Sequence, residues 1–163
     1  MHVKTEATYR CNAEAYWEEL FDAERRTRRE LEGCDTVAFE VRQQRHENGV
    51  AEQESVMEVK VDAPGPVRKV FGQTTRIVES GTKKDTDDFC SVVFRSEKIG
   101  DKATMAGTLR CVEQSDGTSQ VTLELDLKVK IFGIGGMVEK IVAEQLAEHF
   151  QKDAKWFNAN YAK

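Results

Sequence analysis

The sequence predicts an α+β fold in which a curved antiparallel sheet of six or seven strands wraps around a long C-terminal helix, with two short helices after the first strand. Residues 121–131 alternate apolar and polar side chains, which is typical of a long strand with one buried face. After the glycine-rich residues 132–136, apolar side chains recur every three or four positions as far as Phe157, as on one face of a helix. The earlier part of the chain contains further short alternating segments separated by turn signals, and these are expected to complete the sheet.

Bulk properties restrict the class of protein. At 163 residues, the chain is predicted to form a single domain spanning residues 1–163. A net charge of -5 argues against a nucleic-acid-binding protein, because such proteins usually carry a basic surplus. No segment approaches the roughly 18 consecutive apolar residues that a membrane-spanning helix needs. The first residues lack the apolar core of a secretory signal, so a cytoplasmic protein is expected.

The cysteines do not suggest a disulfide framework or a metal site. They are far apart in the sequence, and none belongs to a C-x-x-C pair, which is the spacing that zinc sites commonly use. In a cytoplasmic protein we expect reduced, half-buried thiols. We therefore predict neither a metal nor another cofactor. The four residues are Cys11, Cys34, Cys90 and Cys111.

The first thirty residues predict a strand and two helices. Residues 3–9 alternate like a strand, and Asn12 is a good N-cap for a helix over residues 13–21. Asp22 is expected to cap a second helix that runs to about Leu31 and is closed by Gly33. This second helix contains four arginines. We interpret them as a solvated face balanced by glutamates, with contact to anionic lipid headgroups as the alternative. The arginines are Arg25, Arg26, Arg28 and Arg29.

From residue 35 onward the pattern is that of successive strands. Asn48-Gly49 is a dipeptide favoured in hairpin turns, and it predicts a hairpin between residues 36–42 and 50–61. The two prolines, at positions 64 and 66, then interrupt the sheet, and residues 67–71 are expected to form an apolar turn that plugs its end.

The next segments predict an antiparallel meander. A strand over residues 74–80 is expected to turn near Gly81. Two further strands follow at residues 89–97 and 103–111, before the long strand already described. Glycine and aspartate provide the intervening turns near residues 100 and 116.

No catalytic signature is present. The glycines at 133–136 lack the Gly-Lys-Ser/Thr sequence of a phosphate-binding loop, and they are better explained by a tight strand-to-helix reversal. His149 and Gln145 lie one helical turn apart and could both point into the interior. We expect His149 to be a partly buried, hydrogen-bonded histidine or a group that orients a ligand. Trp156, Phe157 and Tyr161 are expected to anchor the end of the helix against the sheet. The alternative is that Trp156 and Tyr161 form a lip that touches a membrane.

The order of elements resembles the START and Bet v allergen-like superfamily (SRPBCC, polyketide cyclase-like), whose members share a helix-grip fold. The most specific segment is KVKIFGIGGMVEKI, residues 128–141, which is similar to the strand–glycine–helix junction of a bacterial family of unknown function in that superfamily. Residues 66–72, PVRKVFG, also resemble that family. The resemblance implies a cavity between the sheet and the C-terminal helix that holds a lipid, sterol or polyketide-like molecule.

Three functional hypotheses follow. The absence of a catalytic motif favours a non-enzymatic protein that binds or transports a hydrophobic small molecule, with transient membrane contact, as a monomer or weak dimer. The alternatives are a polyketide cyclase or dehydratase-like enzyme that uses His149 as an acid–base group, and a protein-interaction module with a filled core. The predicted ligand-binding residues are Phe94, Arg95, Met105, Val138, Ile141, Val142, Gln145 and His149.

Overall fold

The computed structural model describes residues 1–161 and has the predicted architecture of one antiparallel seven-stranded sheet with a long C-terminal helix. The sheet order is β1-β7-β6-β5-β4-β3-β2, a meander with β1 added beside the last strand. The elements are β1 (His2–Tyr9), α1 (Ala13–Leu20), α2 (Ala23–Gly33), β2 (Ala38–Glu47), β3 (Val50–Lys60), α3 (Gly65–Phe71), β4 (Thr74–Lys84), β5 (Phe89–Ser96), the 3-10 helix η1 (Gly100–Lys102), β6 (Ala103–Glu113), β7 (Ser119–Val129) and α4 (Gly135–Asn160).

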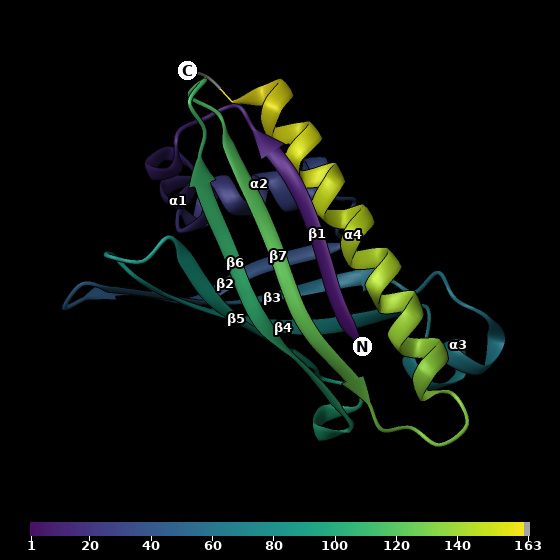
Figure 1. The fold of residues 1–163 in the computed structure, drawn as a ribbon. Helices are drawn as coiled ribbons and strands as arrows, with labels where there is room; N and C mark the ends of the chain where they lie inside the picture. Colours follow the sequence, from purple (N-terminus) through teal and green to yellow (C-terminus); the bar gives the residue numbers. More distant parts are fainter. Residues whose placement is uncertain (162–163) are drawn as a thin grey trace.

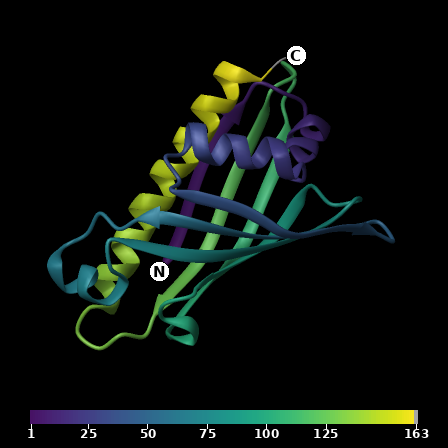
Figure 2. The ribbon, with the colours of Figure 1, turned by 180° about the vertical axis from the view of Figure 1, so that it is seen from behind.

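The sheet curls so strongly that its two halves cross each other. Strands β1, β7 and β6 run along the molecule, whereas β2, β3 and β4 run across it behind them (Figure 1). Helix α4 lies beside β1, and α2 lies above the crossing strands in the opposite view (Figure 2). The interior is therefore bounded by the concave face of the sheet, by α4 along one side and by α2 at one end.

The predicted alternation decides which residues form the core. In β7, Val121, Leu125 and Leu127 are almost completely buried, and the residues between them on the opposite face are at least partly exposed. Strand β1 pairs with β7 in a register that places Val3 opposite Leu125. Since side chains alternate between the two faces of a strand, this register puts the apolar residues of both strands on the concave face.

The two helix starts are formed as predicted. The side chain of Asn12 accepts a hydrogen bond of 2.8 Å from the amide of Ala15, and that of Asp22 accepts one of 2.9 Å from the amide of Arg25. Each cap satisfies an amide that has no partner within its helix.

Gly33 has a different role from the one predicted. It is the last residue of α2, and the left-handed conformation occurs two residues later, at Asp35, with a φ of 56°. A Cβ atom at Gly33 would lie 2.7 Å from the Cβ of Trp156 on α4. The glycine is therefore needed for close contact between α2 and α4.

The turn predicted near Gly81 is wrong. Gly81 lies within β4, opposite Gln53 in β3 and Val92 in β5, and the strand continues to Lys84. A Cβ at Gly81 would lie 3.2 Å from the sulfur of Cys90, so the small residue serves packing between strands. The chain turns over residues 85–88 instead.

The predicted hairpin turn at Asn48-Gly49 and the predicted interruption of the sheet at the two prolines are confirmed. Asn48 and Gly49 both have positive φ, at 52° and 74°, as a two-residue hairpin turn requires. Helix α3 begins at Gly65, between the two prolines, and buries Val67 and Phe71.

The glycine-rich joint leads directly into α4. Strand β7 ends at Val129, and Gly133 adopts a φ of 80°, which few other residues tolerate. A Cβ at Gly135 would lie 2.5 Å from the carbonyl oxygen of Val129, so the chain reverses in close contact with the end of its own strand. Phe132, at the tip of this joint, is fully exposed.

The far end of α4 is anchored by aromatic packing, as one of the two alternatives predicted. Phe157 is buried and stacks on Tyr161 with ring centroids 4.7 Å apart. Trp156 packs against α2, where Arg28 lies 5.5 Å from its ring. Within residues 1–161, no helix is both long and apolar enough to span a membrane.

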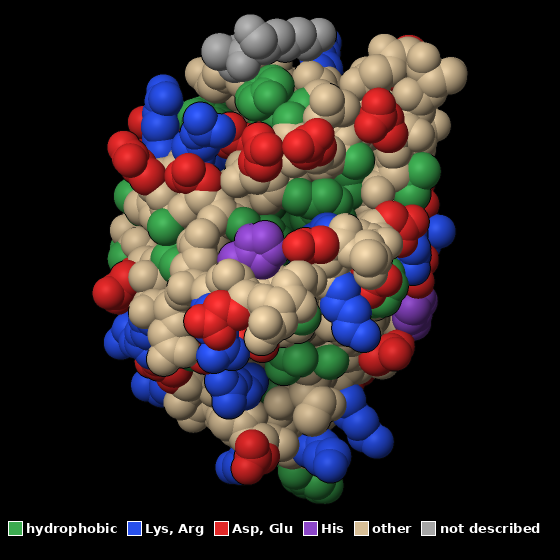
Figure 3. Space-filling model, turned by 90° about the vertical axis from the view of Figure 1, so that its left-hand side faces the viewer, with side chains coloured by type: hydrophobic (Ala, Val, Ile, Leu, Met, Phe, Trp, Pro, Cys, Tyr) green, Lys and Arg blue, Asp and Glu red, His purple; other side chains and the backbone are tan. Residues whose placement is uncertain are grey.

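The surface carries charges of both signs. On the face drawn in Figure 3, acidic and basic side chains are interspersed among small apolar patches. All four cysteines are free thiols, and they are buried rather than half-buried.

Candidate ligand-binding pocket

An internal pocket of about 830 Å³ lies between the concave face of the sheet and helix α4. Seven of the eight residues predicted as ligand-binding line it. Phe94 and Met105 contribute from β5 and β6, and the other five belong to one face of α4. These α4 residues follow the predicted helical spacing, and they are Val138, Ile141, Val142, Gln145 and His149.

Arg95 does not line the pocket, contrary to its prediction as a ligand-binding residue. Its side chain is 63% exposed and lies 3.7 Å from Glu54 in an ion pair. The reason is the alternation of strand side chains, which sends Arg95 outward because its neighbour Phe94 points inward.

Most of the remaining lining is apolar and comes from the same alternation. Strands β3 to β7 present a continuous set of aliphatic and aromatic side chains to the pocket. This set includes Met57, Val59, Ile77, Val92, Leu109, Leu123, Leu127 and Val129. Ile99, just before η1, and Phe71 from α3 also line the pocket.

The rim of the pocket lies where α4 faces the end of β3 and the chain after α2. Gln145 donates a hydrogen bond of 3.2 Å to the carbonyl oxygen of Asp62, and Lys152 lies 3.4 Å from Asp35. Both contacts are exposed, so Gln145 belongs to the rim. This differs from the prediction that Gln145 could point into the interior. Two polar bridges therefore connect the helix to the opposite side of the opening.

A second depression, of about 690 Å³, runs along the outer surface of α2 and β2. It is lined mainly by exposed residues, including Glu24, Arg28 and Glu32. The internal pocket is the stronger candidate, because it is more enclosed than the outer depression and binding sites for small molecules are usually concave.

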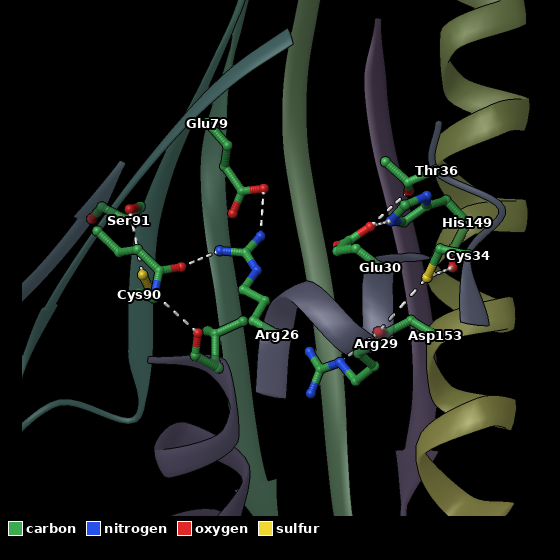
Figure 4. A network of polar contacts seen from close by, with 12 residues as sticks. Arg26, Arg29, Glu30, Cys34, Thr36, Glu79, Cys90, Ser91, His149 and Asp153 are labelled. Atoms are coloured by element: carbon green, nitrogen blue, oxygen red, sulfur yellow. Dashed lines mark hydrogen bonds and ion pairs between the residues drawn. The ribbon is translucent and has the colours of Figure 1, made fainter. Parts of the chain in front are cut away.

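Charged side chains of α2 form one wall of the internal pocket, and here the solvated-face interpretation fails. Arg26, Arg29 and Glu30 are buried, whereas Arg25 and Arg28 are exposed as predicted. The buried three are spaced at i, i+3 and i+4, so they share one face of the helix. That face is directed at the pocket and at α4 (Figure 4).

Arg26 is held by groups from the sheet. Its guanidinium donates a hydrogen bond of 2.7 Å to Glu79 on β4 and a second one to the side-chain oxygen of Gln53 on β3. Glu79 and Gln53 are polar residues at inward-facing strand positions. A polar residue at an inward-facing strand position indicates that a buried charged group lies nearby, because a buried charge needs polar partners. This signal in the sequence could have identified the network.

Arg29 is paired with a carboxylate of α4. Its Nε lies 2.7 Å from Oδ1 of Asp153, and the hydroxyl of Tyr9 donates a hydrogen bond of 2.6 Å to the other oxygen of the same carboxylate. Burial raises the pKa of Tyr9 well above its ordinary value, and the charge of Asp153 adds to this, so the tyrosine remains a donor. The Nη1 atom of Arg29 is buried without an acceptor among residues 1–161.

His149 forms an ion pair with Glu30 across the interface between α4 and α2. Its Nε2 lies 3.1 Å from Oε2 of Glu30, and the hydroxyl of Thr36 donates a hydrogen bond of 3.0 Å to the same oxygen. Burial alone would raise the pKa of Glu30, but the charge and hydrogen bond of His149, with Arg26 and Arg29, outweigh it and lower that pKa to about 2. Burial opposes protonation of His149, yet Glu30 raises its pKa well above the ordinary value. The pair is therefore an imidazolium and a carboxylate at neutral pH.

Cys34 adjoins this pair. Its sulfur lies 3.8 Å from Oδ1 of Asp153, and burial raises the pKa of its thiol. One ligand atom from each of Glu30, Cys34 and His149 lies within 4.8 Å of the others, so these residues could hold a metal ion. The sequence pattern did not reveal this cluster, because Glu30 and Cys34 are separated from His149 by most of the sheet.

Comparisons with solved structures agree with the fold. The chain is similar to the protein TTHA0849 from Thermus thermophilus, with a TM-score of 0.72, 17% identity and coverage of 99% of this chain and 100% of that one. A START superfamily protein from Mycobacterium smegmatis gives a TM-score of 0.68 at 15% identity, covering 99% of both chains. The ZhuI aromatase/cyclase from Streptomyces sp. R1128 gives 0.61 at 16% identity, again with 99% of both chains.

The sequence comparisons identify a family. No curated protein matches the chain. A family model described as "Protein of unknown function (DUF2505)" matches residues 4–159, nearly the whole chain. The START-like fold and this match together agree with the resemblance noted at residues 128–141. The chain belongs to the DUF2505 family of proteins of unknown function.

Proposed function

We propose that this protein binds a hydrophobic small molecule in the pocket between the concave sheet and α4. The observation that supports this most directly is a pocket of about 830 Å³ with a mainly apolar lining and a rim between α4 and the end of β3. Its volume falls within the roughly 300–1,000 Å³ of typical small-molecule sites.

The lining suggests how such a ligand would be held. Removing apolar surface from water contributes about 25 cal/mol per Å², so each 100 Å² of ligand buried would contribute about 2.5 kcal/mol before the entropic cost of binding. Orientation would come from the polar wall on α2, because Nη1 of Arg29 is a buried donor that lacks an acceptor among the described residues. A ligand oxygen, such as a carbonyl or hydroxyl, would supply one. We therefore expect a mostly apolar molecule with at least one hydrogen-bond acceptor.

The test compares two tryptophan variants. Ile141 lines the pocket, whereas Val93 lies on the outer face of β5 and is 43% exposed. Ile141→Trp should abolish binding of an apolar fluorescent probe, and Val93→Trp should leave it unchanged. Circular dichroism of both variants checks that the fold is intact. If folded Ile141→Trp binds the probe as tightly as the wild type, the pocket is not the binding site.

An enzymatic role of the cyclase or dehydratase kind is the second candidate, and one observation favours it. His149 is paired with Glu30 at the pocket wall, so its protonated ring is a potential general acid beside a bound ligand. The similar ZhuI structure is that of an aromatase/cyclase, although an identity of 16% supports only a shared fold. Turnover of a β-hydroxyketone model compound that is lost in His149→Gln, with probe binding retained, would support this role.

A further inference from the structure

Two helices bring three different metal-ligand side chains together at the wall of the pocket. Glu30 and Cys34 are four positions apart at the C-terminal end of α2, and His149 faces them from α4 (Figure 4). Their ligand atoms all lie within 4.8 Å of one another. We propose that Glu30, Cys34 and His149 bind a Zn²⁺ ion, with a fourth coordination position directed toward the pocket.

The distances require only a small adjustment. Zinc binds nitrogen, oxygen and sulfur ligands at about 2.0–2.3 Å, which places the ligand atoms of a tetrahedral site roughly 3.3–3.8 Å apart. Nε2 of His149 and Oε2 of Glu30 are already 3.1 Å apart. Cys34 is the C-cap residue of α2, and a sulfur shift of roughly 1 Å would complete the set.

The donor types favour zinc or a similar transition metal over magnesium and calcium. A thiolate, an imidazole and a carboxylate form a mixed set that suits Zn²⁺, whereas Mg²⁺ and Ca²⁺ prefer oxygen ligands only. Three protein ligands with an open fourth position are typical of zinc sites that bind water or a substrate. All three ligand residues line the pocket, so an oxygen atom of a bound molecule could reach the fourth position.

The surroundings would support the metal ligands. Thr36 donates a hydrogen bond of 3.0 Å to the Glu30 carboxylate and fixes its orientation. Asp153 lies between the guanidinium of Arg29 and the Cys34 thiol, at 2.7 Å and 3.8 Å (Figure 4). Both arginines near the cluster have a carboxylate partner of their own, because Arg29 pairs with Asp153 and Arg26 pairs with Glu79.

The imidazole of His149 and the sulfur of Cys34 bind a metal ion in their deprotonated forms, so protons compete with the ion for the same atoms. Metal affinity should consequently fall as the pH is lowered.

The test uses Co²⁺ as a spectroscopic substitute for Zn²⁺ in the whole chain after treatment with a chelator. We expect one equivalent of Co²⁺ to give a thiolate-to-cobalt charge-transfer band and intense visible bands of a tetrahedral complex, both removed by adding Zn²⁺. Cys34→Ser should remove the charge-transfer band and weaken Zn²⁺ binding by more than about 100-fold, beyond the 10- to 100-fold typical for loss of a supporting residue. Cys90→Ala is the matched control, because Cys90 is a buried cysteine on the opposite side of the polar network (Figure 4).

The wild-type spectrum alone can overturn the proposal, so the test does not depend on any variant being stable. A Co²⁺ complex of the wild type without a thiolate band would exclude Cys34 as a ligand. Equal Zn²⁺ affinity in the wild type and a folded Cys34→Ser variant would do the same. A second variant, His149→Gln, should lose the tetrahedral visible bands, and circular dichroism at a temperature well below its unfolding transition checks that its fold is intact.

Discussion

The imidazole of His149 and the carboxylate of Glu30 lie 3.1 Å apart across the contact between α4 and α2. The Glu30 side chain is 6% exposed and the His149 side chain 27% exposed, so the pair is buried on one side and reaches the pocket on the other. It joins the two helices that bound the pocket, and the stability of the fold and the chemistry of the pocket wall therefore depend on the same residues.

The first prediction concerns the loss of this pair. His149→Gln should lower the free energy of unfolding by about 3 kcal/mol, at the lower end of the range for breaking a buried ion pair, because Glu30 stays buried without its cation. Urea denaturation at pH 7 measures the change. His46→Gln is the control, since His46 forms an exposed ion pair with Asp85 and its loss should cost less than about 1 kcal/mol. Equal losses in the two variants would contradict a stabilising role for the buried pair.

The second prediction concerns acid. The pKa of Glu30 is lowered from 4.5 to about 2, so its contribution to stability is complete above pH 4.5 and is lost as the pH falls toward 2. The pKa of His149 is raised, so its contribution is complete below about pH 6.5 and is lost as the pH rises through the raised value. The urea concentration at which half of the wild-type protein is unfolded should be lower at pH values on either side of this window than within it. In Glu30→Gln, this urea midpoint should depend less steeply on pH on both sides. Unchanged slopes in Glu30→Gln would refute the assignment.

The third prediction separates the charge of Arg29 from its packing. Arg29→Met should destabilise the protein by about 3–5 kcal/mol, because Asp153 would remain buried without a cation, with the neutral groups of Tyr9 and Cys34 beside it. The double variant Arg29→Met/Asp153→Leu should recover much of this loss, since both charges are removed together. A double-mutant cycle from thermal or urea unfolding measures the coupling. Strictly additive losses would mean that the two side chains do not stabilise each other.

The fourth prediction tests the contact between α2 and α4. Gly33→Ala should destabilise the protein by about 1–3 kcal/mol, because the added Cβ would lie 2.7 Å from Trp156 and force the helices apart. Gly65→Ala is the control, since no atom lies within 4 Å of a Cβ at that position. If Gly33→Ala and the control have the same free energy of unfolding, the close contact between α2 and α4 is not needed for stability.

The fifth prediction contrasts neighbours in β5. Phe94→Ala should weaken binding of an apolar probe by roughly tenfold or more, because it removes a large side chain from the pocket lining. Arg95→Ala should have no effect, because Arg95 lies on the outer face. Fluorescence titration of both variants measures the difference. An equal loss of affinity in the two would place the ligand outside the internal pocket.

The fold could be predicted because burial on one face leaves a simple periodicity. Val121, Leu125 and Leu127 show the two-residue period of a strand, and Ile141 and Val142 belong to the three-and-four spacing of α4. The same periodicity placed most of the pocket lining correctly. Gly81 was misinterpreted because a glycine needed for packing beside Cys90 has the same local sequence signal as a glycine needed for a turn.

The polar wall of the pocket could not be predicted in the same way. Arginine and glutamate are usually exposed, so Arg26, Arg29 and Glu30 were interpreted as a solvated face. Their partners lie far away in the sequence, on β4 and α4, and only the folded arrangement brings Glu79 and Asp153 to them. Charged residues at the spacing of a buried helical face, together with polar residues at inward strand positions, are the signal for such a network.

The most direct test of the central claim is native mass spectrometry of the freshly purified protein, followed by solvent extraction and a titration with apolar fluorescent probes. We predict either a co-purifying small molecule of defined mass or saturable probe binding with one site per chain, and loss of that binding in folded Ile141→Trp. A folded wild-type protein that carries no small molecule and binds no apolar probe would contradict the proposed function. It would indicate instead a closed core and a role in protein–protein interaction.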